Sequence, residues 1–95
     1  MAENKGENLY TCYNVVEELV KTKVPPIMES LSMCVCSKCV NDVLAVALNH
    51  LPPKYVVTRQ GQLFAKLHSY ESQYAADIMS AVTKACVKIK SDPKH

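Results

Sequence analysis

The chain has 95 residues, of which 48% are hydrophobic, and it carries a formal net charge of +2. This length fits one small domain, and this apolar fraction is too high for a disordered chain. The small net charge argues against direct binding of duplex DNA, where many phosphates must be neutralised. Five cysteines in a cytoplasmic chain predict a metal site rather than a disulfide framework.

Residues 1–9 are polar and are expected to form a flexible tail, which leaves residues 10–95 as a single domain. Repeated charges in the first 30 residues exclude the apolar core of a signal peptide. The longest uncharged stretch after Asp42 covers only residues 43–53, which is too short to cross a bilayer. We therefore expect a soluble, cytoplasmic protein without membrane insertion.

The first predicted helix begins near Asn14, which stands three residues before Glu17 in the manner of a capping box. Apolar residues then recur at spacings of three and four, which is the spacing of one helical face. Pro25 and Pro26 lack backbone donors and restrict the residues before them, so they predict a break or kink. A second helical piece is expected to continue to about Met33.

Three cysteines within six residues form the most informative motif of the chain. Cys34, Cys36 and Cys39 make a Cys-x-Cys-x-x-Cys cluster, and thiolates at this spacing fit the tetrahedral shell of zinc. The cluster therefore predicts a zinc knuckle between two helices. A site closed by four protein ligands would be structural rather than catalytic. The alternatives are three half-buried thiols without metal, or a redox pair of Cys36 and Cys39 that leaves Cys34 without a role.

The fourth zinc ligand has several candidates. Cys86 is favoured because it lies on the apolar stripe of the last predicted helix and should face inward. A buried cysteine is also a common small hydrophobic residue, so this position has a purely structural interpretation as well. The other candidates for the fourth ligand are Cys12, His50, His68 and a group from a second copy of the chain.

The remaining elements follow the cluster in chain order. Residues 40–51 predict a helix that the prolines at 52–53 stop, and residues 55–57 and 63–65 predict a short hairpin or extended edges. The last helix is predicted over residues 70–91. Its expected buried stripe comprises Ala75, Ile78, Met79, Val82, Cys86 and Ile89. The fold class is therefore mainly α, a small helical domain with a short β-hairpin or extended edge segment.

The segment from Cys34 to Val57, which reads CVCSKCVNDVLAVALNHLPPKYVV, resembles the signature of the bacterial late-competence ComFB family. The preceding run NVVEELV from Asn14, with Gly61 and Lys66, also fits that pattern, and the resemblance covers roughly residues 12 to 93. It implies a small, mostly helical homodimer with zinc-binding cysteines and a link to natural competence. In some members it also implies the sensing of cyclic dinucleotides such as cyclic di-GMP.

A cyclic dinucleotide needs cations for two phosphates, and polar edges and flat surfaces for two bases. The residues that offer these groups near the predicted hairpin and the preceding helix are Asp42, Asn49, Lys54, Tyr55, Arg59 and Lys66. Each also has an ordinary interpretation as a solvated, capping or core side chain. A two-fold axis in a homodimer would double every donor and match a ligand that is itself two-fold symmetric.

The resemblance, together with the cysteine cluster, implies a non-enzymatic regulatory protein that is stabilised by zinc and binds a cyclic dinucleotide (cyclic di-GMP or cyclic di-AMP). We expect it to pass the signal to a protein effector in competence or surface behaviour. The alternative is a zinc-stabilised adaptor of the DNA-uptake machinery that binds no nucleotide. An enzyme is disfavoured because the sequence shows no phosphate-cradling glycine loop and no carboxylate pair near the cysteines.

Overall fold

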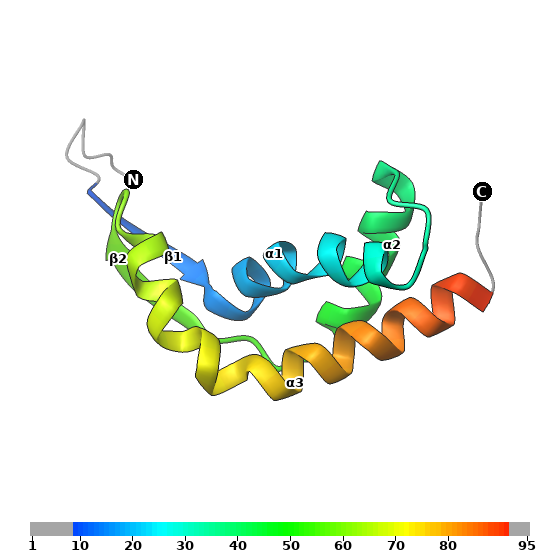
Figure 1. Ribbon diagram of the computed structural model, residues 1–95. Coiled ribbons are helices and arrows are strands. Elements are labelled where there is room, and N and C mark those ends of the chain that lie inside the picture. Colours follow the sequence, from blue (N-terminus) through cyan, green and yellow to red (C-terminus); the bar gives the residue numbers. More distant parts are fainter. Residues whose placement is uncertain (1–8, 92–95) are drawn as a thin grey trace.

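The computed structural model describes residues 9–91 of the chain, which form two strands and three helices (Figure 1). The elements in chain order are β1 (Tyr10–Asn14), α1 (Val15–Ser30), α2 (Ser37–Asn49), β2 (Tyr55–Arg59) and α3 (Leu63–Ser91). The mainly helical class is therefore confirmed. The predicted tail over residues 1–9 lies outside the described residues except for Leu9, whose carbonyl accepts a hydrogen bond from the N–H of Gln60.

The two strands form an antiparallel ribbon in which Tyr10 pairs with Arg59 and Asn14 with Tyr55. The predicted pairing of residues 55–57 with residues 63–65 is wrong, because the partner of β2 is β1. Leu63 to Ala65 instead form the first turn of α3. Leu63 and Leu67 are both buried at a spacing of one helical turn, so this segment follows the helical period and not the strand period.

Asn14 connects the ribbon to α1. Its side-chain Oδ1 accepts hydrogen bonds from the N–H of Val16, at 3.2 Å, and from the N–H of Lys54, at 3.0 Å. The first is the N-cap bond of α1, as the sequence predicts, and the second ties the start of that helix to the segment that enters β2. The N–H of Val15 donates to the carbonyl of Lys54 at 2.7 Å and completes the junction.

Helix α1 runs through both prolines as one helix, so a break there is wrong, whereas a kink stays a prediction. Val20, Val24 and Met28 follow one another at intervals of four residues, and all three are completely buried. Their packing holds the segment in one helix and outweighs the loss of two backbone donors. The carbonyls that lose their partners belong to Lys21 and Thr22, two exposed residues where water can replace the missing donors.

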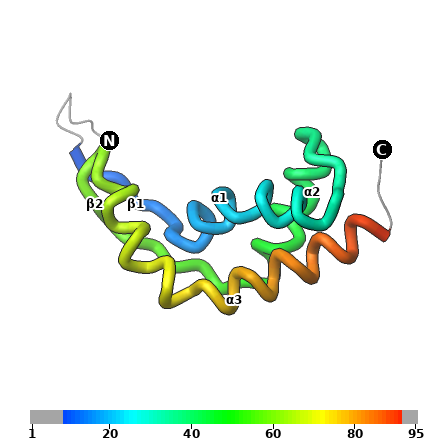
Figure 2. Tube along the Cα trace, viewed as in Figure 1, coloured from blue at the N-terminus to red at the C-terminus, as the bar shows by residue number. Residues whose placement is uncertain are grey.

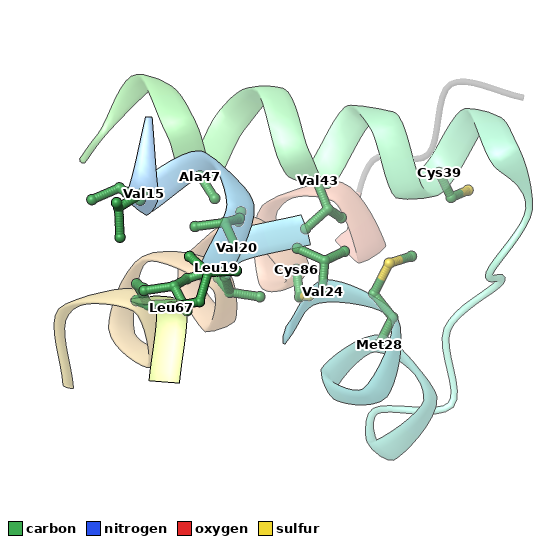
Figure 3. Packing of buried hydrophobic residues seen from close by; sticks show 14 of the residues in the cluster. Val15, Leu19, Val20, Val24, Met28, Cys39, Val43, Ala47, Leu67 and Cys86 are labelled. Atoms are coloured by element: carbon green, nitrogen blue, oxygen red, sulfur yellow. The ribbon is translucent and has the colours of Figure 1, made fainter. Parts of the chain in front are cut away.

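Helix α3 has 29 residues and is therefore about 43 Å long, close to the 48 Å length of the molecule. Both α1 and α2 pack against it, and they also contact each other (Figure 1). Their shared core contains Val15, Leu19, Val20, Val24, Met28, Val43, Ala47, Ile78, Val82 and Cys86, most of which are labelled in Figure 3. The predicted stripe of α3 is confirmed at Ile78, Val82 and Cys86, whereas Ala75 and Met79 are exposed.

The molecule is elongated, with extents of 48 × 29 × 20 Å and a radius of gyration of 15.4 Å. A compact domain of this length has a radius of gyration of about 12 Å. The ribbon and the first turns of α3 project at one end, and the loop between α1 and α2 lies at the other (Figure 2). None of the helices within residues 9–91 combines the length and the apolar character needed to cross a lipid bilayer.

Candidate metal centre

The loop that carries the cysteines begins with a tightly closed helix end. At the end of α1, the N–H of Met33 donates to the carbonyl of Met28 and the N–H of Ser32 to that of Glu29, both at 3.0 Å. These two bonds form a Schellman motif. Ser32 takes the left-handed conformation that the motif requires, with φ of 57°. The motif turns the chain away from α1 directly before Cys34.

Two further contacts fix the loop from outside. The Lys90 ammonium near the end of α3 donates to the carbonyl of Leu31 at 2.9 Å. On the other side of the loop, Cys36 is the N-cap residue of α2, and its Sγ accepts a hydrogen bond from the N–H of Cys39 at 3.4 Å. A single sulfur atom therefore starts α2 and belongs to the cysteine cluster.

The sulfur atoms of Cys34, Cys36 and Cys39 lie within 4.8 Å of one another. Zinc–sulfur bonds of about 2.3 Å at tetrahedral angles place two sulfur atoms about 3.8 Å apart, so small side-chain rotations bring all three thiolates onto one ion. Cys34 and Cys36 are exposed, whereas Cys39 is buried on the core side. The three cysteines can thus hold a soft metal ion at the surface end of the core.

The thiols differ in acidity before any metal binds. A hydrogen bond from the backbone N–H of Cys39, followed by hydrogen bonding with Cys34, lowers the pKa of Cys36 from 9.0 to about 7. Burial, followed by hydrogen bonding with Cys36, raises the pKa of Cys39 to about 11. Cys36 therefore ionises more readily than Cys39, and it lies at the positive end of the α2 dipole.

The structure does not bring the four predicted metal ligands together. Cys86 is fully buried, and Figure 3 shows it apart from Cys39 along the core. The other candidates lie farther away along the helices. His50 follows the 13 residues of α2, which span about 20 Å, and His68 lies 22 residues, or about 33 Å, before Lys90 on α3. Cys12 lies on β1, beyond the far end of α1. Cys86 as fourth ligand stays a prediction.

The residues predicted to bind a cyclic dinucleotide are scattered over the molecule. Asp42 accepts from Lys38 one turn earlier on α2, at 2.6 Å, and Asn49 is the exposed last residue of that helix. Lys54 directly precedes β2. Tyr55 and Arg59 are the first and last residues of that strand and lie on the same face of the ribbon. Lys66 is exposed on the second turn of α3. None of these six side chains lines either of the two pockets that lie beside α3 in the described part of the chain.

A groove that the sequence reasoning missed lies between the end of α2 and the middle of α3. Its volume is about 580 Å³. The residues that line it are Val46, His50, Leu51, Pro52, Asp77, Ser80, Ala81, Lys84, Ala85 and Lys88. In the sequence, the only sign of this groove is that Ser80, Lys84 and Lys88 recur every four residues and so lie on one face of α3. This spacing does not show that the end of α2 packs opposite them.

Comparison with known proteins places the chain in a family. The family model for late competence development protein ComFB matches residues 13–93. Competence protein ComFB of Bacillus subtilis (strain 168) is 27% identical over 81 residues, which cover 84% of this chain and 83% of that protein. The solved structure of late competence protein ComFB from Bacillus subtilis superposes with a TM-score of 0.70 and 26% identity, over 88% of this chain and 93% of that one. The chain therefore belongs to the late competence development protein ComFB family.

Proposed function

We propose that this chain is a non-enzymatic, cytoplasmic regulatory protein that binds a cyclic dinucleotide and passes the signal to a protein effector in natural competence or surface behaviour. The observation that carries the proposal is the match of the late competence development protein ComFB family model over residues 13–93, which include all three helices and β2. Cyclic di-GMP is the first candidate ligand and cyclic di-AMP the second, as the resemblance of the sequence implies.

The composition of the cysteine cluster supports a structural role for its metal. The group that can hold an ion consists of thiols alone, with no histidine or carboxylate among its members in residues 9–91. Catalytic zinc needs an open water position and a nearby base, and thiols supply no such base here. We therefore propose one structural zinc ion per chain, held by Cys34, Cys36, Cys39 and, as fourth ligand, Cys86.

A Cys86→Ala variant tests the fourth ligand, because alanine keeps a small apolar side chain in the core. The metal content of this variant, purified without added zinc, should fall below that of the wild type. An unchanged content of one ion per chain would assign the fourth position to another group.

Exposed apolar side chains support a homodimer. Tyr10, Tyr55 and Val57 lie on the outer face of the ribbon, and each is at least 60% exposed. Phe64, on the first turn of α3 beside the ribbon, is 77% exposed. Such a gathering on one end of an elongated chain is unfavourable in water and fits an isologous interface with a second copy.

Titration calorimetry with cyclic di-GMP and cyclic di-AMP tests the proposed ligand. Saturable binding of one of the two, with a rise in melting temperature, is the expected result. The absence of both heat and thermal shift at high micromolar ligand would contradict the proposal.

A zinc-stabilised adaptor without a nucleotide ligand is the second candidate function. It is favoured by the scatter of the predicted ligand residues and by the exposed apolar side chains at the ribbon end, Tyr10, Tyr55, Val57 and Phe64. Arg59→Ala addresses the ligand site that the sequence predicts. Binding of the nucleotide weakens in this variant if Arg59 contacts a phosphate, whereas the adaptor binds no nucleotide with or without the substitution.

A further inference from the structure

The groove between α2 and α3 combines an apolar floor with a charged rim. Val46 and Leu51 from the α2 side and Ala81 and Ala85 from α3 supply apolar surface. Its volume of about 580 Å³ lies within the range of pockets that bind small organic ligands. A flat, uncharged ring can therefore bury one side here, while the rim remains available for polar groups.

The cationic part of the rim lies on α3. Lys84 and Lys88 are one turn apart on the same face, and Ser80 lies one turn before Lys84. All three are exposed, and neither lysine takes part in an ion pair within residues 9–91. Two ammonium groups and a hydroxyl in one row suit the oxygen atoms of a phosphate.

On the other side of the groove, the ring of His50 is held in place. Its Nδ1 lies 2.8 Å from the carbonyl of Val46, one turn earlier on α2. This contact orients the ring at the edge of the groove, with its second nitrogen directed away from the helix carbonyl. When Nδ1–H donates to this carbonyl, Nε2 of the neutral ring is an acceptor, so the ring can receive a hydrogen bond from a ligand hydroxyl or N–H group.

Asp77 is the one acidic residue that lines the groove, and its carboxylate indicates which base the ligand carries. Asp77 lies seven residues before Lys84, about 10 Å along the helix, which leaves room for a sugar between two bound groups. A carboxylate accepts two hydrogen bonds side by side, and the Watson–Crick edge of guanine presents two adjacent N–H donors. Adenine offers no such pair.

We propose that this groove binds a guanine nucleotide, with the phosphate at Lys84 and Lys88, the base on the apolar floor and its donor edge at Asp77. The inference rests on the proposed function in that a cyclic dinucleotide containing guanine is the ligand it would take. It moves the binding site from the ribbon residues Arg59 and Lys66 to the crossing of α2 and α3.

The test compares two double variants by titration calorimetry with cyclic di-GMP, cyclic di-AMP and guanosine monophosphate. Lys84→Ala with Lys88→Ala removes the cations of the groove, and Arg59→Ala with Lys66→Ala removes an equal charge at the ribbon end. All four side chains are exposed, Lys66, Lys84 and Lys88 lie in α3, where alanine is favoured, and Arg59 is the last residue of β2. Both variants should therefore keep the fold, which circular dichroism checks. We expect affinity for a guanine ligand to fall roughly tenfold to a hundredfold in the first variant only.

The other outcomes distinguish a failure of the proposed groove site from a failure of the proposed function. A loss confined to the ribbon variant overturns the groove but leaves the proposed function standing. Binding of guanosine monophosphate alone, lost in the groove variant, supports the groove and overturns the cyclic dinucleotide. Wild-type protein that binds none of the three ligands overturns both.

Asp77→Asn tests the base contact separately, because an amide cannot accept both donors of guanine. The preference for guanosine over adenosine monophosphate should decrease in this variant while the lysines still hold the phosphate. Equal affinities of the wild type for the two nucleotides would contradict the role of Asp77.

Discussion

At the scale of single residues, Cys36 has two structural roles, since its sulfur belongs to the cluster and also caps α2. Replacement by serine should release the proposed zinc and lower the melting temperature substantially, because a hydroxyl is a poor zinc ligand. Elemental analysis and calorimetry on the same sample measure both effects. Cys12→Ser, at an exposed position on β1, is the matched control and should keep the metal. A Cys36→Ser protein with wild-type metal content and stability would refute the site.

Asn14 is the second residue whose side chain has more than one role. Asn14→Ala removes the acceptor for both Val16 and Lys54 and should destabilise the protein by about 1 to 2 kcal/mol in chemical denaturation. Asn14→Asp retains an acceptor oxygen at the N-terminus of α1 and should stay close to the wild type. Equal losses in the two variants would show that the amide nitrogen, and not the oxygen, is the important group.

At the scale of elements, the Schellman motif at the end of α1 contains a serine where glycine is the usual residue. Ser32→Gly should stabilise the protein by about 0.5 to 1 kcal/mol, because glycine adopts a positive φ without steric cost. Denaturant midpoints measure the change. The same substitution at Ser72, within α3, should destabilise by roughly 0.5 kcal/mol, since a helical φ favours serine over glycine. If both substitutions destabilise, the left-handed conformation of Ser32 is not the native one.

The ion pair between Lys23 and Glu71 joins α1 to α3 and predicts a dependence of stability on pH. Hydrogen bonding and attraction to Lys23 lower the pKa of Glu71 below its ordinary value of 4.5. A lowered carboxyl pKa stabilises the fold above pH 4.5, and this contribution disappears as the pH falls through the pKa of the folded state. Glu71→Gln should therefore be less stable than the wild type at pH 7, with the difference vanishing in acid. Parallel stability curves between pH 7 and pH 3 would contradict this.

How far the sequence predicts the fold differs from element to element. The N-cap at Asn14, the cysteine cluster and the end of α2 before the double proline follow from local chemistry and are confirmed. The continuity of α1 through Pro25 and Pro26 and the pairing of β2 with β1 depend on packing between distant segments, which no local pattern encodes. The strand β1 was not predicted, although the residues from Tyr10 to Tyr13 have strand propensity and could have indicated it.

The candidate site shows the same division. Cys34, Cys36 and Cys39 were predictable because their spacing alone brings them together. The groove between α2 and α3 could not be predicted, because its two walls are 25 or more residues apart in the chain and meet only where α2 packs against α3. The six predicted ligand residues are scattered because Asp42 and Asn49 lie on α2, whereas the others lie at the ribbon and on α3. The predicted hairpin of residues 55–57 and 63–65, which would have gathered four of them, does not form because residues 63–65 are helical.

At the scale of the whole molecule, the elongated shape and the apolar ribbon end predict a dimer in solution. Phe64→Glu places a charge in the proposed interface, at a helix N-terminus where an acid is otherwise favourable, and should yield monomers. Val87→Glu, at an equally apolar but distant exposed position of α3, should stay dimeric. Sedimentation or light scattering gives the mass. A wild type with the mass of one chain would contradict the interface.

The shared sulfur of Cys36 has a practical consequence for handling the protein. A reagent that alkylates or oxidises this thiol alters the acceptor that caps α2, so chemical modification of Cys36 also weakens the first turn of that helix. Ageing in air should therefore lower the melting temperature as well as the number of free thiols, and reductant in the storage buffer protects both.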